Sequence, residues 1–282
     1  MITADPRVVD AGGVELAYVE AGDADPPIVL VHGFTGAKED YGDHLEWLGR
    51  EQRAIAFDNR GHGQSARTDS YSLDLVRGDI AAFADALGLG RFVLVGHSMG
   101  GFVAQQYALA APERLIGLVL MGTGPGAPRI DADFRRTADA ARRLARDAGM
   151  EVLLQVQQNL VENDPAAAAL ASESDVRLRR ERPGYVDFCD AKFVATDPVA
   201  YDELLGDILD QEDRTGALGG LDVETLVVVG DEDRTFRKAA RRLADAIPGA
   251  RFEEIAGAGH SPQFEAPAAW RDAVGSFLRE LR

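Results

Sequence analysis

Residues 93–101 read Val-Leu-Val-Gly-His-Ser-Met-Gly-Gly, so an apolar, largely β-branched run stops at a Gly-X-Ser-X-Gly turn. A helix-compatible segment, residues 102–111, follows at once. This order predicts a strand, a sharp turn and a helix, with Ser98 at the apex and glycines where the two backbones come close together. Free N–H groups at a helix start favour developing negative charge. The Ser98 hydroxyl is therefore well placed to attack a carbonyl carbon.

Strands and helices alternate on both sides of this turn. Residues 14–20 alternate apolar and polar residues and predict a half-exposed strand, paired with residues 7–10 across an Ala-Gly-Gly turn. The other expected strands are 28–31, 54–57, 92–95, 115–121, 225–229 and 251–255, and the expected helices are 41–48, 73–87, 102–111, 238–246 and 267–281. This rhythm predicts an α/β fold with a doubly wound, mainly parallel eight-stranded sheet.

The strand pattern stops between residues 123 and 216. Five helical stretches are expected there instead, at 132–147, 150–161, 165–180, 185–194 and 198–209. A helical block inserted between two core strands predicts a lid. The expected organisation is a core domain formed by residues 1–122 and 217–282, with a helical cap over residues 123–216.

The composition limits the partners and cofactors. A net charge of −17 over 282 residues disfavours binding to nucleic acid or to an anionic membrane surface. Cys189 is the only cysteine, so we expect neither an internal disulfide nor a cysteine-based metal site. The first ten residues lack a signal-peptide pattern, and no apolar run reaches membrane-spanning length. We expect a cytoplasmic protein without membrane insertion that uses no metal, flavin, nicotinamide or other cofactor.

A serine hydroxyl needs a base to take its proton, and five histidines could supply one. His260 lies in a glycine-rich loop after the last expected strand, from which it can reach Ser98 at the carboxyl edge of the sheet. His97 adjoins Ser98 and points away from it, so packing or hydrogen bonding beneath the turn is expected. His62 is expected to brace a glycine-rich loop, and His44 to be a surface residue of a helix. His260 is therefore the predicted base.

The imidazole in turn needs a carboxylate that fixes its tautomer and stabilises its protonated form. The expected strand 225–229 runs into Gly230-Asp231-Glu232-Asp233 at the same edge of the sheet. Asp233 is the candidate acid, because the turn at Gly230 leaves it farther out toward the base. Asp231 and Glu232 are the alternatives.

A carbonyl oxygen under attack becomes negative and needs two N–H donors placed in advance. The N–H of Met99, which directly follows the expected nucleophile, is one candidate. The other is expected from the loop after strand 28–31, where Gly33 keeps the backbone at Phe34 accessible. The predicted oxyanion hole therefore consists of the N–H groups of Phe34 and Met99.

Taken in order, these motifs resemble the α/β-hydrolase fold superfamily, in particular its lidded bacterial serine esterases. The resemblance rests on His32-Gly33-Phe34, on Gly-His-Ser-Met-Gly-Gly at 96–101, on residues 58–65, and on Gly259-His260-Ser261-Pro262 with Glu265 and Pro267. It covers the chain outside the expected lid. It implies Ser98 as nucleophile, Asp233 as acid and His260 as base. A serine nucleophile separates the chain from the haloalkane dehalogenases and soluble epoxide hydrolases, which use aspartate.

The first function hypothesis is a carboxylic ester hydrolase acting on a small-molecule substrate. The same three residues would serve lactone or enol-lactone hydrolysis, carbon–carbon hydrolysis of a diketone, or perhydrolysis; a non-enzymatic receptor is the third class. The expected substrate-binding residues are Phe34, Leu153, Phe188 and Phe193, with Leu154, Val156, Leu160 and Leu204 as further candidates. Packing inside the lid is the competing role for the lid residues. No heptad or exposed strand edge predicts an oligomeric state.

Overall fold

A single sheet of eight strands forms the centre of the molecule, and the computed structural model describes residues 5–164 and 171–281. The strands are β1 (Arg7–Asp10), β2 (Glu15–Ala21), β3 (Ile28–Val31), β4 (Ala54–Phe57), β5 (Phe92–His97), β6 (Leu115–Met121), β7 (Thr225–Gly230) and β8 (Arg251–Ile255). Their spatial order is β1-β2-β4-β3-β5-β6-β7-β8. β2 pairs antiparallel with β1 and β4, and all other neighbours are parallel. The predicted α/β fold with a mainly parallel sheet is confirmed.

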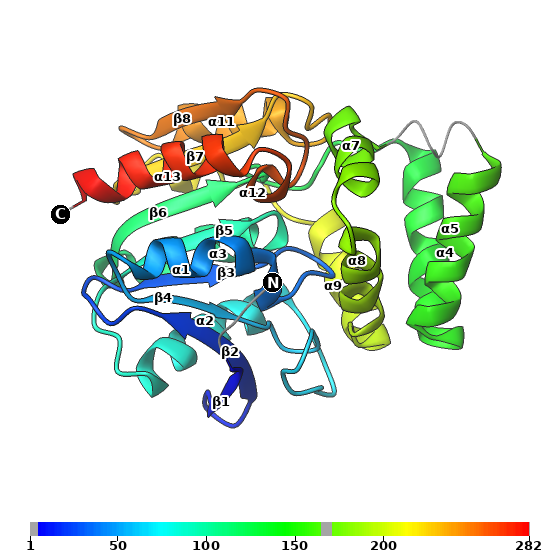
Figure 1. The fold of residues 1–282 in the computed structure, drawn as a ribbon, viewed down its shortest axis with the longest axis horizontal. Helices are drawn as coiled ribbons and strands as arrows, with labels where there is room; N and C mark the ends of the chain where they lie inside the picture. The colour runs from blue at the N-terminus through cyan, green and yellow to red at the C-terminus, as the bar shows by residue number, and fades with distance from the viewer. Residues whose placement is uncertain (1–4, 165–170, 282) are drawn as a thin grey trace.

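Helices cover both faces of this sheet (Figure 1). They are α1 (Gly42–Gly49), α2 (Leu73–Ala86), α3 (Met99–Ala110), α11 (Arg237–Ala246) and α13 (Pro267–Glu280). Consecutive residues of one strand divide between two apolar layers: Val29 and Val31 of β3 pack with α2, α3 and α11, whereas Ile28 and Leu30 pack with α1 and α13. Each residue of β3 is therefore buried whichever way it points, which explains the continuous apolar run in this strand.

Strand β2 is more buried than its alternating pattern predicts. Leu16, Ala17, Tyr18 and Val19 are all buried, so the prediction of a half-exposed strand is wrong. The reason is that β2 lies between β1 and β4 and is covered on both faces: Leu16 and Tyr18 join one apolar layer, and Val19 joins the other.

The described chain between β6 and β7 contains helices and no strand. These helices are α4 (Ala132–Ala148), α5 (Met150–Asn163), α7 (Glu173–Glu181), α8 (Tyr185–Val194), α9 (Pro198–Leu209) and α10 (Thr215–Leu218). Figure 1 shows α4, α5, α7, α8 and α9 beyond one end of the sheet, with the α4–α5 pair outermost. The expected helix at 165–180 falls partly on residues 165–170, which lie outside the described residues; α7 begins only at Glu173. Helix α10 spans the expected core–cap boundary at residue 216.

Helix α9 ties this insertion to the core. The Asp197 N–H, at its start, donates to the Gly61 carbonyl (2.7 Å). The Glu203 carboxylate accepts the Tyr71 N–H (2.7 Å) just before α2 begins. On its other side α9 binds α4, because the Arg142 guanidinium donates to Asp202 (2.8 Å). Helix α9 therefore links α4 to the core.

Candidate active site

Ser98 occupies the turn between β5 and α3. Its backbone lies at φ 52° and ψ −112°, a conformation that residues other than glycine rarely adopt. The turn is held because the Ser98 N–H donates to the Met121 carbonyl of β6 (2.8 Å), while the Ser98 carbonyl accepts the Gly101 N–H (2.9 Å). A Cβ added to Gly100 would lie 2.5 Å from the Val31 carbonyl oxygen, so only glycine fits beside β3. The strained turn lifts the hydroxyl clear of the sheet.

His260 lies between Ser98 and Asp233. Its Nε2 is 2.9 Å from Ser98 Oγ, and its Nδ1 is 2.9 Å from Asp233 Oδ2. The serine follows β5, the aspartate follows β7 and the histidine follows β8. Because these strands are parallel, their carboxyl ends meet at one edge of the sheet. The structure thus brings together the three side chains that the sequence analysis selected.

Asp233 is buried and strongly hydrogen-bonded. Its Oδ1 accepts the N–H groups of Thr235 (3.1 Å) and Phe236 (2.9 Å), while Oδ2 faces His260. Burial acts to raise the pKa of Asp233, but the hydrogen bond and charge of His260 and the two backbone donors outweigh it and lower the pKa. The carboxylate is therefore charged and accepts Nδ1–H, which leaves Nε2 of His260 free to accept the serine proton.

The alternative acids are engaged elsewhere. Asp231 Oδ1 accepts the N–H of Gly257 (2.8 Å), and Glu232 Oε2 accepts the N–H of Ser174 (2.8 Å). Of the three neighbouring carboxylates, Asp233 is the one that faces the imidazole of His260.

His97 supports His260 from beneath the turn. Its Nε2–H donates to the His260 carbonyl (2.8 Å), and the two rings lie 5.0 Å apart. Burial lowers the pKa of His97 to about 3, so the ring is neutral. On the other side, the Phe236 ring stacks on His260 at 5.3 Å. The imidazole of His260 is thereby held between two rings.

The two predicted oxyanion donors both lie next to Ser98. Met99 is the first residue of α3, where a helix offers its N–H no acceptor. Phe34 lies in the loop after β3, and a Cβ added to the preceding Gly33 would lie 3.2 Å from Ser98 Cβ. Within residues 5–164 and 171–281, neither N–H donates to a protein acceptor. Both are therefore available to a bound carbonyl oxygen.

His32 fixes the loop that carries Phe34. Its Nε2 accepts the Asn59 N–H (2.9 Å), and its Nδ1–H donates to the Gly33 carbonyl (2.7 Å). Burial lowers the pKa of His32, so the ring stays neutral and both nitrogens are used in these bonds. This placement gives His32 a structural role.

His44 is fully buried, so the prediction of a surface position is wrong. Its Nε2–H donates to the Gln263 carbonyl (2.8 Å), its Nδ1 accepts from Arg271 (3.1 Å), and its ring packs on Trp270 at 4.3 Å. Helix α12 (Pro262–Glu265) and α13 cover this face of α1. The pattern of α1 cannot show this, because the covering helices lie more than 200 residues away in the chain.

Acidification is expected to destabilise the protein through His44. Burial lowers its pKa from 6.5 to about 4; Arg271 and Arg182 act in the same direction, against the Gln263 carbonyl bond and the Asp43 charge. Between pH 6.5 and 4 the unfolded state therefore binds a proton that the native state does not. The contribution of His44 to the free energy of unfolding should therefore fall toward acid by up to about 1.4 kcal/mol per pH unit.

Urea unfolding of the wild type and His44→Gln at several pH values from 7.5 to 4 measures this effect. The variant should show a shallower fall than the wild type between pH 6.5 and 4. Equal slopes for His44→Gln and the wild type would contradict the assignment.

The predicted pocket residues lie in two separate places. Leu153 of α5 and Phe193 of α8 pack with Tyr201 of α9 in one apolar cluster, which also contacts Phe34. The rings of Phe34 and Tyr201 are 4.9 Å apart. These side chains therefore form an apolar surface beside the loop that carries Phe34, one of the two predicted oxyanion donors.

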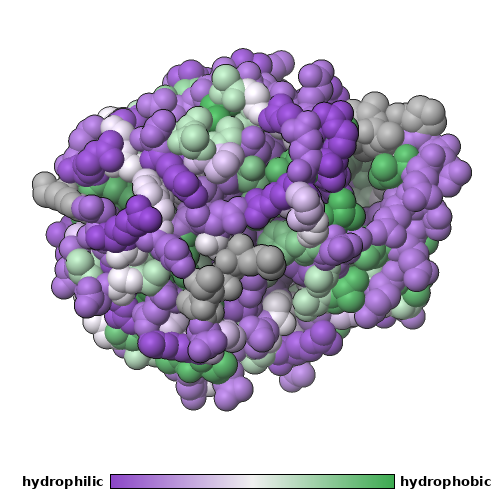
Figure 2. Space-filling view, viewed as in Figure 1, coloured by the Kyte–Doolittle hydropathy of each residue, from purple (hydrophilic) through white to green (hydrophobic). Residues whose placement is uncertain are grey.

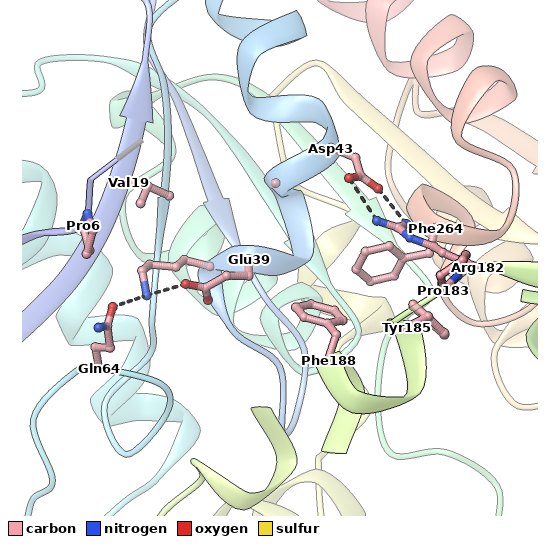
Figure 3. A pocket seen from close by; sticks show the side chains of 13 residues that line it. Pro6, Val19, Glu39, Asp43, Gln64, Arg182, Pro183, Tyr185, Phe188 and Phe264 are labelled. Atoms are coloured by element: carbon pink, nitrogen blue, oxygen red, sulfur yellow. Dashed lines mark hydrogen bonds and ion pairs between the residues drawn. The ribbon is translucent and has the colours of Figure 1, made fainter. Parts of the chain in front are cut away.

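Phe188 lies apart from this cluster. It lines a cavity of about 730 Å³ between the start of α1 and the α7–α8 connection, together with Tyr185 and Phe264 (Figure 3). The Arg182–Asp43 ion pair lies at one side of this cavity. Neither Ser98 nor His260 lines this cavity. The structure thus does not bring Phe188 together with Phe34.

The further candidates for the substrate pocket do not lie together either. Val156 and Leu160 of α5 are 39% and 48% exposed, and Leu204 of α9 is buried against the α2–α3 layer. Figure 2 shows apolar surface gathered over the helices of the insertion.

The described helices include none with the length and apolar character of a membrane span. Among the described residues, no cluster of three or more histidine, cysteine or acidic side chains could hold a metal ion.

A serine on a strand–helix turn, backed by an imidazole and a buried carboxylate at the edge of a parallel sheet, defines the class of α/β proteins with a nucleophile elbow. A family model for the alpha/beta hydrolase fold matches residues 26–267. The chain therefore belongs to the α/β hydrolase fold family.

Solved structures that resemble the chain include several hydrolases. A thermophilic esterase from Thermogutta terrifontis is 26% identical, with 99% of each chain covered and a TM-score of 0.82. An enol-lactonase from Burkholderia xenovorans LB400 is 25% identical, with 97% of this chain and 100% of that chain covered and a TM-score of 0.82. A hydrolase from Pseudomonas aeruginosa is 26% identical, with 98% and 99% covered and a TM-score of 0.79. Family and neighbours together support a hydrolytic activity.

Proposed function

We propose that this protein is a serine hydrolase that cleaves carboxylic esters through an acyl-enzyme on Ser98. The observation that carries the proposal is the line of two 2.9 Å hydrogen bonds from Asp233 through His260 to Ser98 Oγ. Such a line allows a neutral imidazole to take the serine proton while a charged carboxylate stabilises the imidazolium that results.

The first step is attack on the ester carbonyl. Ser98 Oγ forms the new C–O bond as its proton moves to His260 Nε2, and the carbonyl oxygen becomes an oxyanion. The N–H groups of Met99 and Phe34 donate to that oxygen. Loss of one such donor typically costs about 10²–10³ in rate, so their placement supplies a large part of the catalysis.

The second step releases the products. The oxyanion collapses, the ester C–O bond breaks, and His260 gives its proton to the leaving alkoxide oxygen. A water molecule then loses a proton to His260 and attacks the acyl-enzyme carbonyl. Release of the acid returns the proton to Ser98 and restores the starting state.

The helices over residues 123–216 serve as the cap in this proposal, over a core of residues 1–122 and 217–282. The cluster of Leu153, Phe193 and Tyr201 against Phe34 supplies an apolar surface next to the oxyanion donors. That surface suits an apolar part of a small or medium-sized ester.

Enol-lactones are the second candidate substrates. The enol-lactonase from Burkholderia xenovorans LB400 matches this chain over 97% of its length with a TM-score of 0.82. Ring opening would use the same steps, except that the leaving oxygen stays joined to the acyl chain.

Stopped-flow hydrolysis of p-nitrophenyl acetate, butyrate and octanoate, run beside a series of lactones and enol-lactones, tests the proposal. We expect a burst of nitrophenolate equal to one acyl-enzyme per chain, followed by steady turnover. A kcat/KM at least about tenfold higher for enol-lactones would favour the second candidate. Folded protein that turns over neither class would contradict both.

A further inference from the structure

The first turn of α7, in the helical insertion, is docked on the loops that carry His260 and Asp233. Ser174 makes this contact and is fully buried. Its Oγ donates to Glu265 Oε2 (2.8 Å), and its N–H donates to Glu232 Oε2 (2.8 Å). One residue of the insertion is thus bonded to two carboxylates of the core.

Glu265 holds the backbone on both sides of His260. Its Oε2 accepts the N–H of Gly259, and its Oε1 accepts the N–H of Ser261 (3.3 Å). A carboxylate that receives N–H groups from both neighbours of a residue restrains the peptide units on either side of it. The position of the His260 imidazole therefore depends on where the Glu265 carboxylate lies.

Glu232 links the Ser174 contact to Asp233, the proposed acid. It directly precedes Asp233, and its N–H donates to the Ala258 carbonyl (2.9 Å) in the His260 loop. Ser174 therefore lies where the loops of the base and the acid meet.

The contact is closely packed as well as polar. Ser172 Oγ caps α7 by accepting the Asp175 N–H (3.1 Å), and it lies 2.9 Å from Ser174 Oγ. The Ser172 side chain also occupies the position that a Cβ on Gly259 would need. Because Ser174 is fully buried, water cannot readily replace its hydroxyl at Glu265.

We infer that Ser174 is a positioning residue that couples the seating of the helical insertion to the geometry of His260. The inference rests on the proposed role of His260 as the catalytic base. When α7 is seated, Ser174 Oγ–H orients Glu265, and Glu265 holds Gly259 and Ser261. Without that hydroxyl, Glu265 Oε2 loses a buried donor, its carboxylate turns, and the His260 loop gains freedom. The insertion thereby acts on the chemical step as well as on substrate binding.

Ser174→Ala tests this coupling with two independent readouts. The first is amide hydrogen exchange by NMR at Gly259 and Ser261, which needs no enzymatic activity. The second is kcat per active site, with sites counted by a fluorophosphonate probe so that unfolded protein is not scored. The matched control is Arg180→Ala on the same helix, where an exposed guanidinium pairs with the adjacent Glu181.

We expect exchange at both amides to rise, and kcat per labelled site to fall, by about tenfold or more in Ser174→Ala, with KM changed less than kcat. Glu265→Gln should reproduce both effects, and the double variant should lose little beyond either single one. A merely structural role would lower the number of labelled sites and leave kcat per site unchanged.

The two proposals fail in different ways. Wild-type protein that hydrolyses no ester would contradict the proposed function, while faster exchange at Gly259 and Ser261 in Ser174→Ala would still support the positioning role. Exchange at these amides that matches Arg180→Ala and the wild type would overturn the positioning role, whatever the turnover.

Discussion

Replacing Ser98 by alanine should lower kcat for ester hydrolysis by about 10⁴- to 10⁶-fold while the protein stays folded. In the proposed mechanism the hydroxyl oxygen forms the acyl-enzyme, and its 2.9 Å contact with His260 Nε2 is the path for its proton. Alanine removes both, and only binding and the oxyanion donors remain. Turnover of p-nitrophenyl esters, with circular dichroism to check the fold, measures the effect.

His260→Ala serves as the companion variant and should lose nearly as much activity. Because Ser98 and His260 act as one unit in the proposed mechanism, the double variant should be little worse than either single one. Ser276→Ala, on the exposed face of α13, is the matched serine control and should keep wild-type kcat. Additive losses in the double variant would contradict a shared step.

Asp233→Asn should lower kcat by about 10⁴-fold. An amide in this position can present N–H rather than oxygen to His260 Nδ1, which favours the tautomer with the proton on Nε2. That proton blocks the nitrogen that must accept from Ser98. The amide also carries no charge to stabilise the imidazolium. Steady-state kinetics of the folded variant measures the loss.

Asp231→Asn is the matched control for the acid. Asp231 accepts the Gly257 N–H and does not contact His260, so its variant should stay within a fewfold of wild-type kcat. A larger loss in Asp231→Asn than in Asp233→Asn would reassign the acid.

The sheet was predictable because its signals are local and repeated. Runs such as 28–31 and 92–95 are short, apolar at every position and rich in β-branched residues, which favours a strand covered on both faces. Parallel strands place their carboxyl ends at one edge, so the residues after β5, β7 and β8 were expected to meet there. The structure places Ser98, Asp233 and His260 within hydrogen-bond reach in that arrangement.

The positions that could not be predicted depend on contacts between distant segments. His44 is buried by α12 and α13, and the sequence of α1 alone does not indicate that these helices pack on it. Phe188 and Phe193 lie five residues apart on α8, so their side chains point about 140° apart around the helix and pack in different places. Which of the two faces the Phe34 cluster depends on how α8 packs against the core. Ser174 is not part of a recognisable sequence motif. Its partners, Glu232 and Glu265, follow β7 in the chain, so the contact could not be predicted from the sequence around Ser174.

Mass spectrometry of the protein after reaction with a fluorophosphonate tests the central claim most directly. The account predicts one phosphonyl adduct per chain, located on the peptide that contains Ser98, and a loss of labelling in Ser98→Ala and His260→Ala. Folded wild-type protein that stays unlabelled, or an adduct that persists on another residue in Ser98→Ala, would contradict it.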